Sequence, residues 1–137
     1  MINYFSNNNF KLKNKQKIRN WLNKAILMEN HVVGNINYIF CSDEQLLEIN
    51  IKYLDHDYYT DIITFDYKEN NRVSGDLYLS TDRIIDNAKL NNISFDEEII
   101  RVLIHGILHI IGYNDKSPNE SKLMREKENF YINLYKN

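Results

Sequence analysis

Hydrophobic positions repeat with helical spacing in five parts of the chain and alternate with polar positions in others. Apolar residues three and four apart share one face of a helix, whereas alternation is typical of a strand. The patterns predict helices over about 14–29, 42–53, 81–92, 94–111 and from Pro118 onward. They predict strands over 34–41, 60–67 and 75–80, with a short strand or arm within residues 1–10. The fold class we expect is α+β, a small mixed sheet of about four strands packed with helices.

Residues that begin helices support these boundaries. Ser42 is followed three residues later by Gln45, which is the spacing of a capping box. Ser94 and Glu97 repeat this spacing before the most apolar helix, and Thr81 is the expected N-cap of the helix before it. Polar connections are expected over 55–59 and 68–74.

Residues 101–115 read R-V-L-I-H-G-I-L-H-I-I-G-Y-N-D and place two histidines inside an apolar run. His105 and His109 are four residues apart, so on a helix they share one face, like the zinc ligands of an H-E-x-x-H motif. Gly112 can end the helix, because glycine readily takes the left-handed conformation. Asp115 then offers an oxygen. The spacing predicts a metal site of His105, His109 and Asp115 on the central helix and the loop after it.

The histidine pair alone has a second interpretation, because two histidines in an apolar helix are often core residues satisfied by hydrogen bonds. The glycine and aspartate at metzincin-like spacing favour a metal. Three protein ligands leave one position of a tetrahedral zinc open, which is typical of a catalytic zinc. The hard oxygen of Asp115 also makes Mn or Ni acceptable substitutes. Gly106 stands where zinc proteases have their general-base glutamate, which disfavours ordinary peptide hydrolysis.

Composition limits the class of protein. The chain of 137 residues has 43% hydrophobic and 26% charged residues, as soluble globular proteins do. The single cysteine, Cys41, excludes an internal disulfide framework and favours a reducing compartment. No apolar run approaches a membrane span, and the first residues lack the features of a secretory signal. We therefore expect one cytoplasmic domain over 1–137 with no membrane partner.

Charge gives no general attraction to nucleic acid, because the formal net charge is −2. Any RNA contact must therefore come from a local basic patch. The candidates are Lys11, Lys13, Lys15, Lys17 and Arg19. Such a cluster fits either phosphate contacts or a solvated helix face.

Three segments follow the order and spacing of motifs in one known family. Residues 105–115 (H-G-I-L-H-I-I-G-Y-N-D) match the pattern H-G-x-L-H-x-x-G-Y-D-H. Residues 53–65 (Y-L-D-H-D-Y-Y-T-D-I-I-T-F) match Y-R-G-K-D-x-P-T-D-V-L-S-F, and residues 75–80 (G-D-L-Y-L-S) match G-D-I-x-I-S. On these segments, which cover most of the chain from about residue 40, the sequence resembles the YbeY family of metal-dependent endoribonucleases.

The resemblance implies a small α+β fold and a zinc-dependent enzyme that cuts single-stranded RNA. It further implies roles in late 3′-end maturation of small-subunit (16S) ribosomal RNA and in ribosome quality control. The partners it implies are single-stranded RNA, ribosomal RNA and components of the small ribosomal subunit, with no DNA. His105 and His109 match the first two metal ligands of the family, and Asp115 stands where its third histidine stands.

One loop departs from the family pattern. Leu54 stands where the family has an arginine thought to face the substrate, and His56 stands at its lysine position. His56, Asp57 and Asp61 lie in this segment and are the candidates for catalytic groups, without a ranking among them.

Two other functions stay open from the sequence. One is a ribosome-assembly binding protein in which the metal is mainly structural, because the missing arginine at Leu54 is consistent with weak catalysis. The other is a metallopeptidase-like hydrolase with a displaced base, which Gly106 disfavours.

Overall fold

Four strands form one sheet in the order β1-β2-β4-β3 in the computed structural model, which describes all 137 residues. Their bounds are β1 (Ile2–Ser6), β2 (Val32–Cys41), β3 (Ile62–Asp66) and β4 (Arg72–Ser80). Strands β1, β2 and β4 are parallel to one another, and β3 is antiparallel to β4. The helices are α1 (Lys15–Met28), α2 (Asp43–Leu54), α3 (Thr81–Leu90), α4 (Phe95–Ile111) and α5 (Pro118–Lys136). The predicted α+β class with a small mixed four-stranded sheet is confirmed.

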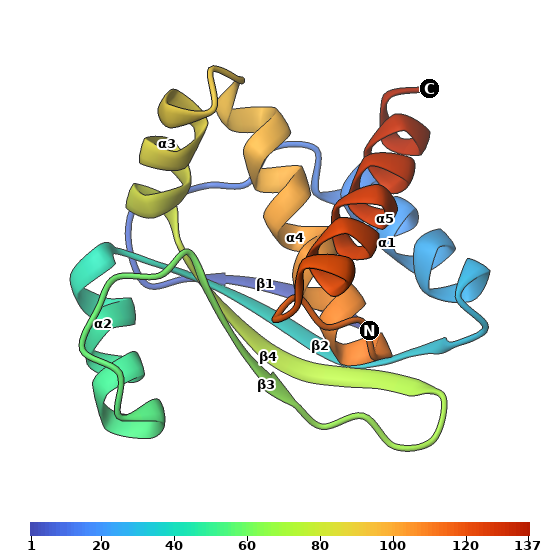
Figure 1. The fold of residues 1–137 in the computed structure, drawn as a ribbon, viewed down its shortest axis with the longest axis horizontal. Helices are drawn as coiled ribbons and strands as arrows, with labels where there is room; N and C mark the ends of the chain where they lie inside the picture. Colours follow the sequence, from blue (N-terminus) through green and yellow to red (C-terminus); the bar gives the residue numbers. More distant parts are fainter.

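Most of the helices cover one face of the sheet. In Figure 1, α4 crosses that face with α3 on one side and α5 on the other, while α2 lies apart at the opposite side of the sheet. The alternation along β2 explains this arrangement: Ile36, Tyr38 and Phe40 are almost completely buried in the main core. The Tyr38 hydroxyl donates to the carbonyl of Leu103 at 2.8 Å, which joins β2 to the middle of α4.

Helix α4 is the centre of the core, and ten of its 17 residues are buried. It lies so close to the sheet that a Cβ atom added at Gly106 would meet Leu77 Cδ2 at 2.3 Å and Ile62 Cδ1 at 2.9 Å. Burying a helix face of this size is the main source of its stability, because apolar area removed from water contributes about 25 cal/mol per Å². The close approach also places the neighbouring residue, His105, beside the start of β3.

Several predicted boundaries are wrong by a few residues. Strand β4 begins at Arg72 rather than Gly75, because the polar residues before Gly75 pair with β2, Arg72 opposite Val32. Ser80, not Thr81, is the N-cap of α3: its hydroxyl accepts from the Arg83 N–H, whereas Thr81 points toward the Cys41 carbonyl.

Other local predictions are confirmed. The capping box of Ser42 and Gln45 is complete, and the Ser94 hydroxyl accepts from the Glu97 N–H at the start of α4. Helix α5 begins at Pro118, as predicted from the sequence. No helix has both the length and the apolar character needed to cross a membrane.

Candidate metal centre

Two candidate ligands lie on α4 and the third on the loop that follows it. His105 and His109 are one turn apart, with ring centroids 4.5 Å from each other. Their Nε2 atoms lie 3.5 and 3.3 Å, respectively, from Oδ2 of Asp115. Ligand atoms of all three residues lie within 4.8 Å of one another. The structure therefore brings together the three residues expected from the sequence spacing.

These separations fit a small tetrahedral cation. Two ligand atoms about 2.0–2.1 Å from a zinc ion, at tetrahedral angles, lie about 3.3 Å from each other. The distances of 3.3 and 3.5 Å between the imidazole nitrogens and Asp115 match this value. Two imidazoles and a carboxylate are also ligands that zinc accepts. The donor set therefore fits a zinc-sized divalent cation.

A buried glutamate of α5, which the sequence analysis missed, orients the first histidine. His105 donates from Nδ1 to Oε2 of Glu128 at 2.6 Å, and Arg101 donates to Oε1 of the same carboxylate at 2.9 Å. This contact leaves Nε2 of His105 free to face the metal position. Burial alone would raise the pKa of Glu128, but the hydrogen bonds from His105 and Arg101 hold it below its usual value. Glu128 therefore stays charged and fixes the ring.

The loop that carries Asp115 is held at both ends. At its start, Gly112 has a φ of 134°, a value that L side chains rarely adopt, and this conformation turns the chain away from α4. At its end, the Ser121 hydroxyl donates to the Asp115 carbonyl at 2.7 Å. Between them, the Tyr113 hydroxyl donates to Glu29 at the end of α1 at 2.6 Å. The third ligand is therefore positioned by contacts from two other helices.

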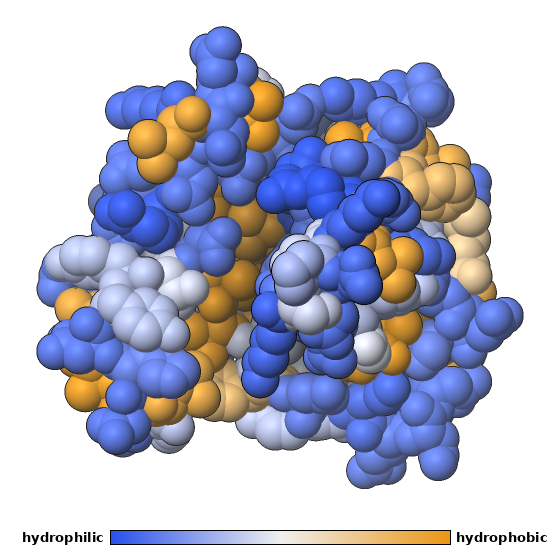
Figure 2. Space-filling view, in the orientation of Figure 1, coloured by the Kyte–Doolittle hydropathy of each residue, from blue (hydrophilic) through white to orange (hydrophobic).

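A cleft of about 670 Å³ opens in front of the three ligands. Figure 2 shows a hollow on this face, with apolar side chains along its floor and hydrophilic side chains at its sides. The cleft lies between α4, the start of β3 and the segment after α2. Its lining residues include His56, Asp61 and Lys116 in addition to the ligands. A volume of this size accommodates a nucleotide-sized ligand.

Of the two aspartates among the predicted catalytic candidates, Asp57 and Asp61, only Asp61 lines this cleft. Burial raises the pKa of its carboxyl, and the nearby His105 opposes the shift. His56 also lines the cleft and is stacked on Tyr58, with ring centroids 5.2 Å apart. Asp57 is exposed and is not part of the lining. The structure thus separates three residues that the sequence left unranked.

The whole chain matches one family of proteins. Residues 2–136 match the family described as Endoribonuclease YbeY. The chain belongs to this family. Relatives named Endoribonuclease YbeY include one from Christiangramia forsetii, 53% identical over 98% of this chain and 94% of the relative. One from Flavobacterium johnsoniae is 50% identical over 98% of this chain and 97% of the relative. A solution structure of a Thermotoga maritima protein has a TM-score of 0.71 and 29% identity, covering 98% of this chain and 89% of that one.

The resemblance to the YbeY family that three motifs indicated is therefore confirmed. The departures from the family pattern lie at the cleft. Leu54, at the family's arginine position, lines the cleft and is 42% exposed. Lys116, which the sequence analysis did not single out, is the cleft's one lysine or arginine, and no carboxylate lies within 4.0 Å of it. It is adjacent in sequence to the third ligand, which is a signal that could have identified it.

Gly106 has a structural role that its place in the H-E-x-x-H pattern does not indicate. The residue faces Leu77 and Ile62 of the sheet, and the space there is too small even for a Cβ atom. A glutamate there would have to enter the core instead of reaching the metal position. The steric environment thus agrees with the sequence argument against the H-E-x-x-H mechanism of peptide hydrolysis.

The basic cluster predicted from the sequence does not lie at the cleft. Lys11, Lys13, Lys15, Lys17 and Arg19 belong to the segment after β1 and to the first turns of α1. None of them is among the residues that line the cleft. If this cluster contacts RNA, it must do so at a distance from the metal ligands.

Proposed function

We propose that this member of the YbeY family is a zinc-dependent endoribonuclease that cuts single-stranded RNA, with residues 1–137 acting as one hydrolase domain. The observation that carries the proposal is the set of three ligand atoms within 4.8 Å of one another at the wall of an open cleft. A structural zinc is normally enclosed by four protein ligands, whereas three ligands beside a cleft are typical of a catalytic site. Mn or Ni are the substitutes that the Asp115 oxygen would admit.

Each residue of the cleft has a proposed role. His105, His109 and Asp115 hold the metal, and Glu128 keeps the imidazole of His105 in the orientation that directs Nε2 to it. A zinc ion held there would supply a Lewis acid that can polarise a phosphate oxygen and lower the pKa of water. Asp61 accepts the proton of the attacking water as the new P–O bond forms, and this proton then passes to the leaving ribose oxygen as its P–O bond breaks. The raised pKa of Asp61 brings the group closer to neutral pH, which suits both transfers.

Substrate binding is proposed to rest on the rim of the cleft. Lys116 is an unpaired cation beside Asp115, so its ammonium is free to pair with a phosphate. The stacked rings of His56 and Tyr58 offer a flat surface on which an unpaired base can stack. Stacking requires bases that are not already paired, which favours single-stranded RNA as the substrate.

For the cellular role, we propose cytoplasmic maturation of the 3′ end of small-subunit ribosomal RNA and ribosome quality control. This part rests on membership of the endoribonuclease family. Its expected sign is accumulation of unprocessed small-subunit RNA in cells that lack the protein. The partners would be ribosomal RNA and components of the small subunit.

The test combines metal content with cleavage. Purified protein should contain close to one zinc per chain and cleave unstructured RNA, and a chelator should abolish the cleavage. His109→Ala should lose both the metal and the activity. Metal-loaded protein that leaves RNA intact while still binding ribosomes would favour the assembly-factor alternative, and cleavage of a peptide library would favour a metallopeptidase.

The role of Asp61 has its own measurement. Asp61→Asn should retain the metal and lose cleavage by about a hundredfold or more, the usual contribution of a general base. Asp57→Asn removes a neighbouring carboxylate that does not line the cleft and serves as the comparison. If Asp57→Asn loses the cleavage activity and Asp61→Asn keeps it, the assignment of the general base to Asp61 is wrong.

A further inference from the structure

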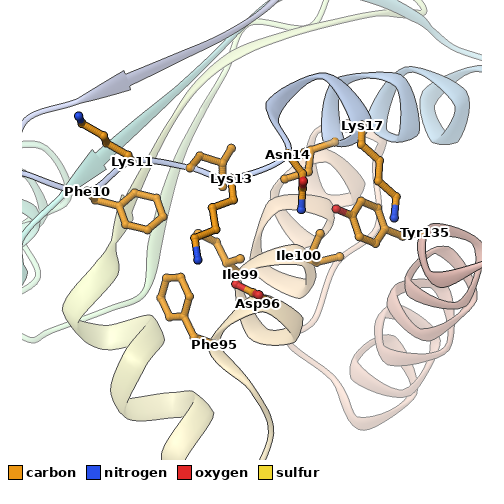
Figure 3. A pocket seen from close by; sticks show the side chains of 12 residues that line it. Phe10, Lys11, Lys13, Asn14, Lys17, Phe95, Asp96, Ile99, Ile100 and Tyr135 are labelled. Atoms are coloured by element: carbon orange, nitrogen blue, oxygen red, sulfur yellow. The ribbon is translucent and has the colours of Figure 1, made fainter.

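A second pocket, of about 390 Å³, opens on the face of α4 away from the metal ligands. Its lining includes Asp96, Ile99 and Ile100 of α4. At 100° per residue, these positions lie about 120–180° around the helix from His105. They also lie up to about 14 Å along the helix axis from it. The pocket therefore belongs to a different surface from the cleft. Figure 3 shows the side chains that line it.

Uncompensated positive charge surrounds this pocket. Lys11, Lys13 and Lys17 line it, and no carboxylate lies within 4.0 Å of their ammonium groups. Asp96 is the one acidic residue of the lining. Lys15 and Lys17 are in the first turn of α1, which contains no acidic residue, although a helix N-terminus favours negative charge. Cations at this end cost stability unless they meet an anion, which points to an anionic ligand.

Aromatic side chains lie beside the lysines. Figure 3 shows Phe10 and Phe95 at one end of the pocket and Tyr135 with Lys17 at the other. The Phe10 and Phe95 rings are 5.7 Å apart between centroids, and Lys17 Nζ lies 4.2 Å from the centre of the Tyr135 ring. All three aromatic residues are only partly buried. A ligand with both phosphate groups and flat rings would meet both kinds of partner.

The surface extends beyond one pocket. A neighbouring hollow of about 740 Å³ shares Phe10 and Lys11 with the first and adds Tyr4, Phe5 and Lys15. Phe5 is 52% exposed although it is a large apolar residue. Because the two hollows share lining residues, they form one surface that carries both lysines and aromatic rings and has more room than a single nucleotide requires. We name it the β1–α1 surface, defined by the residues that line the two hollows.

We propose that the β1–α1 surface is a second binding site for single-stranded RNA, which holds the substrate at a distance from the cut. The proposal rests on the proposed function, because the strand it holds is the one that enters the metal cleft. Cationic grooves with aromatic side chains bind single strands through phosphate pairing and base stacking. An acidic peptide would use the lysines but not the ring faces, and a mononucleotide would fill only one of the two hollows.

The geometry predicts a dependence on RNA length. A strand of about two or three nucleotides fills the cleft alone and is too short to pass around α4, a helix about 10–12 Å across with its side chains, to the β1–α1 surface. A strand of about thirty nucleotides is long enough. The second site should therefore affect only the longer substrate.

The test compares two double variants of the metal-loaded protein. Lys13→Gln with Lys17→Gln should raise KM for the long RNA about fivefold, leave kcat unchanged and leave both constants unchanged for the short RNA. The matched control is Lys24→Gln with Lys89→Gln, which removes the same charge from two exposed lysines outside both hollows. Equal effects on short and long RNA, or equal effects of the two double variants, would overturn the proposal.

Binding measured separately distinguishes failure of this site from failure of the proposed function. Stopped-flow anisotropy of labelled long RNA reads binding before any cleavage. Loss of two phosphate contacts should make the slope of log affinity against log salt shallower by about 1.4. If RNA binds through these lysines but is never cut, the proposed binding site stands and the proposed endoribonuclease activity is wrong. A mononucleotide that binds as tightly as the long RNA would reject the extended site.

Discussion

Glu128 orients one ligand of the proposed metal site, because it accepts a hydrogen bond from the His105 imidazole at 2.6 Å. Glu128→Gln keeps the size of the side chain but removes its charge, so the imidazole is oriented less firmly and becomes a weaker ligand. We expect zinc affinity to fall by about 10- to 100-fold, the usual cost of losing such a partner. Competition with a chromophoric chelator measures the change. Glu126→Gln, an exposed neighbour on α5 without an ion pair, should leave the affinity unchanged.

Gly106 tests how closely α4 must approach the sheet. Gly106→Ala introduces a Cβ atom 2.3 Å from Leu77 Cδ2, so the helix or the leucine must shift. The expected loss in free energy of unfolding is about 1–3 kcal/mol, the range for overpacking in a core. Urea denaturation measures it. In the background of Leu77→Ala the same substitution should cost much less; an undiminished cost would mean that the clash with Leu77 is not the cause.

Among the elements, the end of α1 is tied to α5 through one carboxylate. Glu29 accepts from Tyr113 at 2.6 Å, from Lys127 at 3.1 Å and from Tyr131. Burial alone would raise its pKa, but these three donors hold it below the ordinary value of 4.5. Because Tyr113 is in the loop of the third ligand, this contact links the packing of α1 and α5 to the metal site.

Glu29→Gln should lower the free energy of unfolding by about 2 kcal/mol at pH 7, since hydrogen bonds to a charged group are lost. A carboxyl whose pKa is lowered by folding stabilises the protein above its unfolded pKa and loses that contribution as pH falls through the folded pKa. The difference in free energy of unfolding between the unsubstituted protein and Glu29→Gln should therefore shrink below about pH 4.5. Urea titrations at several pH values measure it, with exposed Glu48→Gln as control. If this difference in stability persisted at low pH, the charge of the Glu29 carboxylate would not be what stabilises the fold.

The sequence predicted the helices and strands better than the contacts between them. The helices and the strand centres follow from local periodicity, and the spacing of His105, His109 and Asp115 follows from one helix and one turn. Glu128 could not be placed at the site from local pattern, because its partner is 23 residues away. It does share the buried stripe of α5 with Met124 and Tyr131, and a charged residue on such a stripe requires a partner.

Pairing between strands explains the misplaced boundary of β4. Arg72 and Ser74 do not look like strand residues in isolation, yet β2 provides parallel neighbours for this part of the chain. The same limit applies to Lys116 and Asp61, which are 55 positions apart in sequence but line one cleft. Local propensity contains no information on such long-range neighbours, which tertiary packing decides.

Considered as a whole, the molecule places its two proposed RNA contacts on opposite faces of α4. The ligands and the cleft use one face, and the β1–α1 surface uses the other. The rigid, buried helix between them keeps their separation fixed, so an RNA strand that engages both must bend around the protein. If both proposals hold, the lysines that line the cleft and the β1–α1 surface would supply the local positive charge for a polyanion, although the net charge of the chain is −2.

The metal should also stabilise the whole fold, because its ligands join α4 to the loop before α5 and exist as a site only in the folded chain. A ligand that binds only the folded state at 100 times its Kd adds about 2.7 kcal/mol, which for a chain of this size raises Tm by about 10 °C. Calorimetry with and without chelator measures the shift. His109→Ala should unfold at the same temperature in both conditions. If zinc raised Tm equally in that variant, the stabilising site would lie elsewhere on the chain.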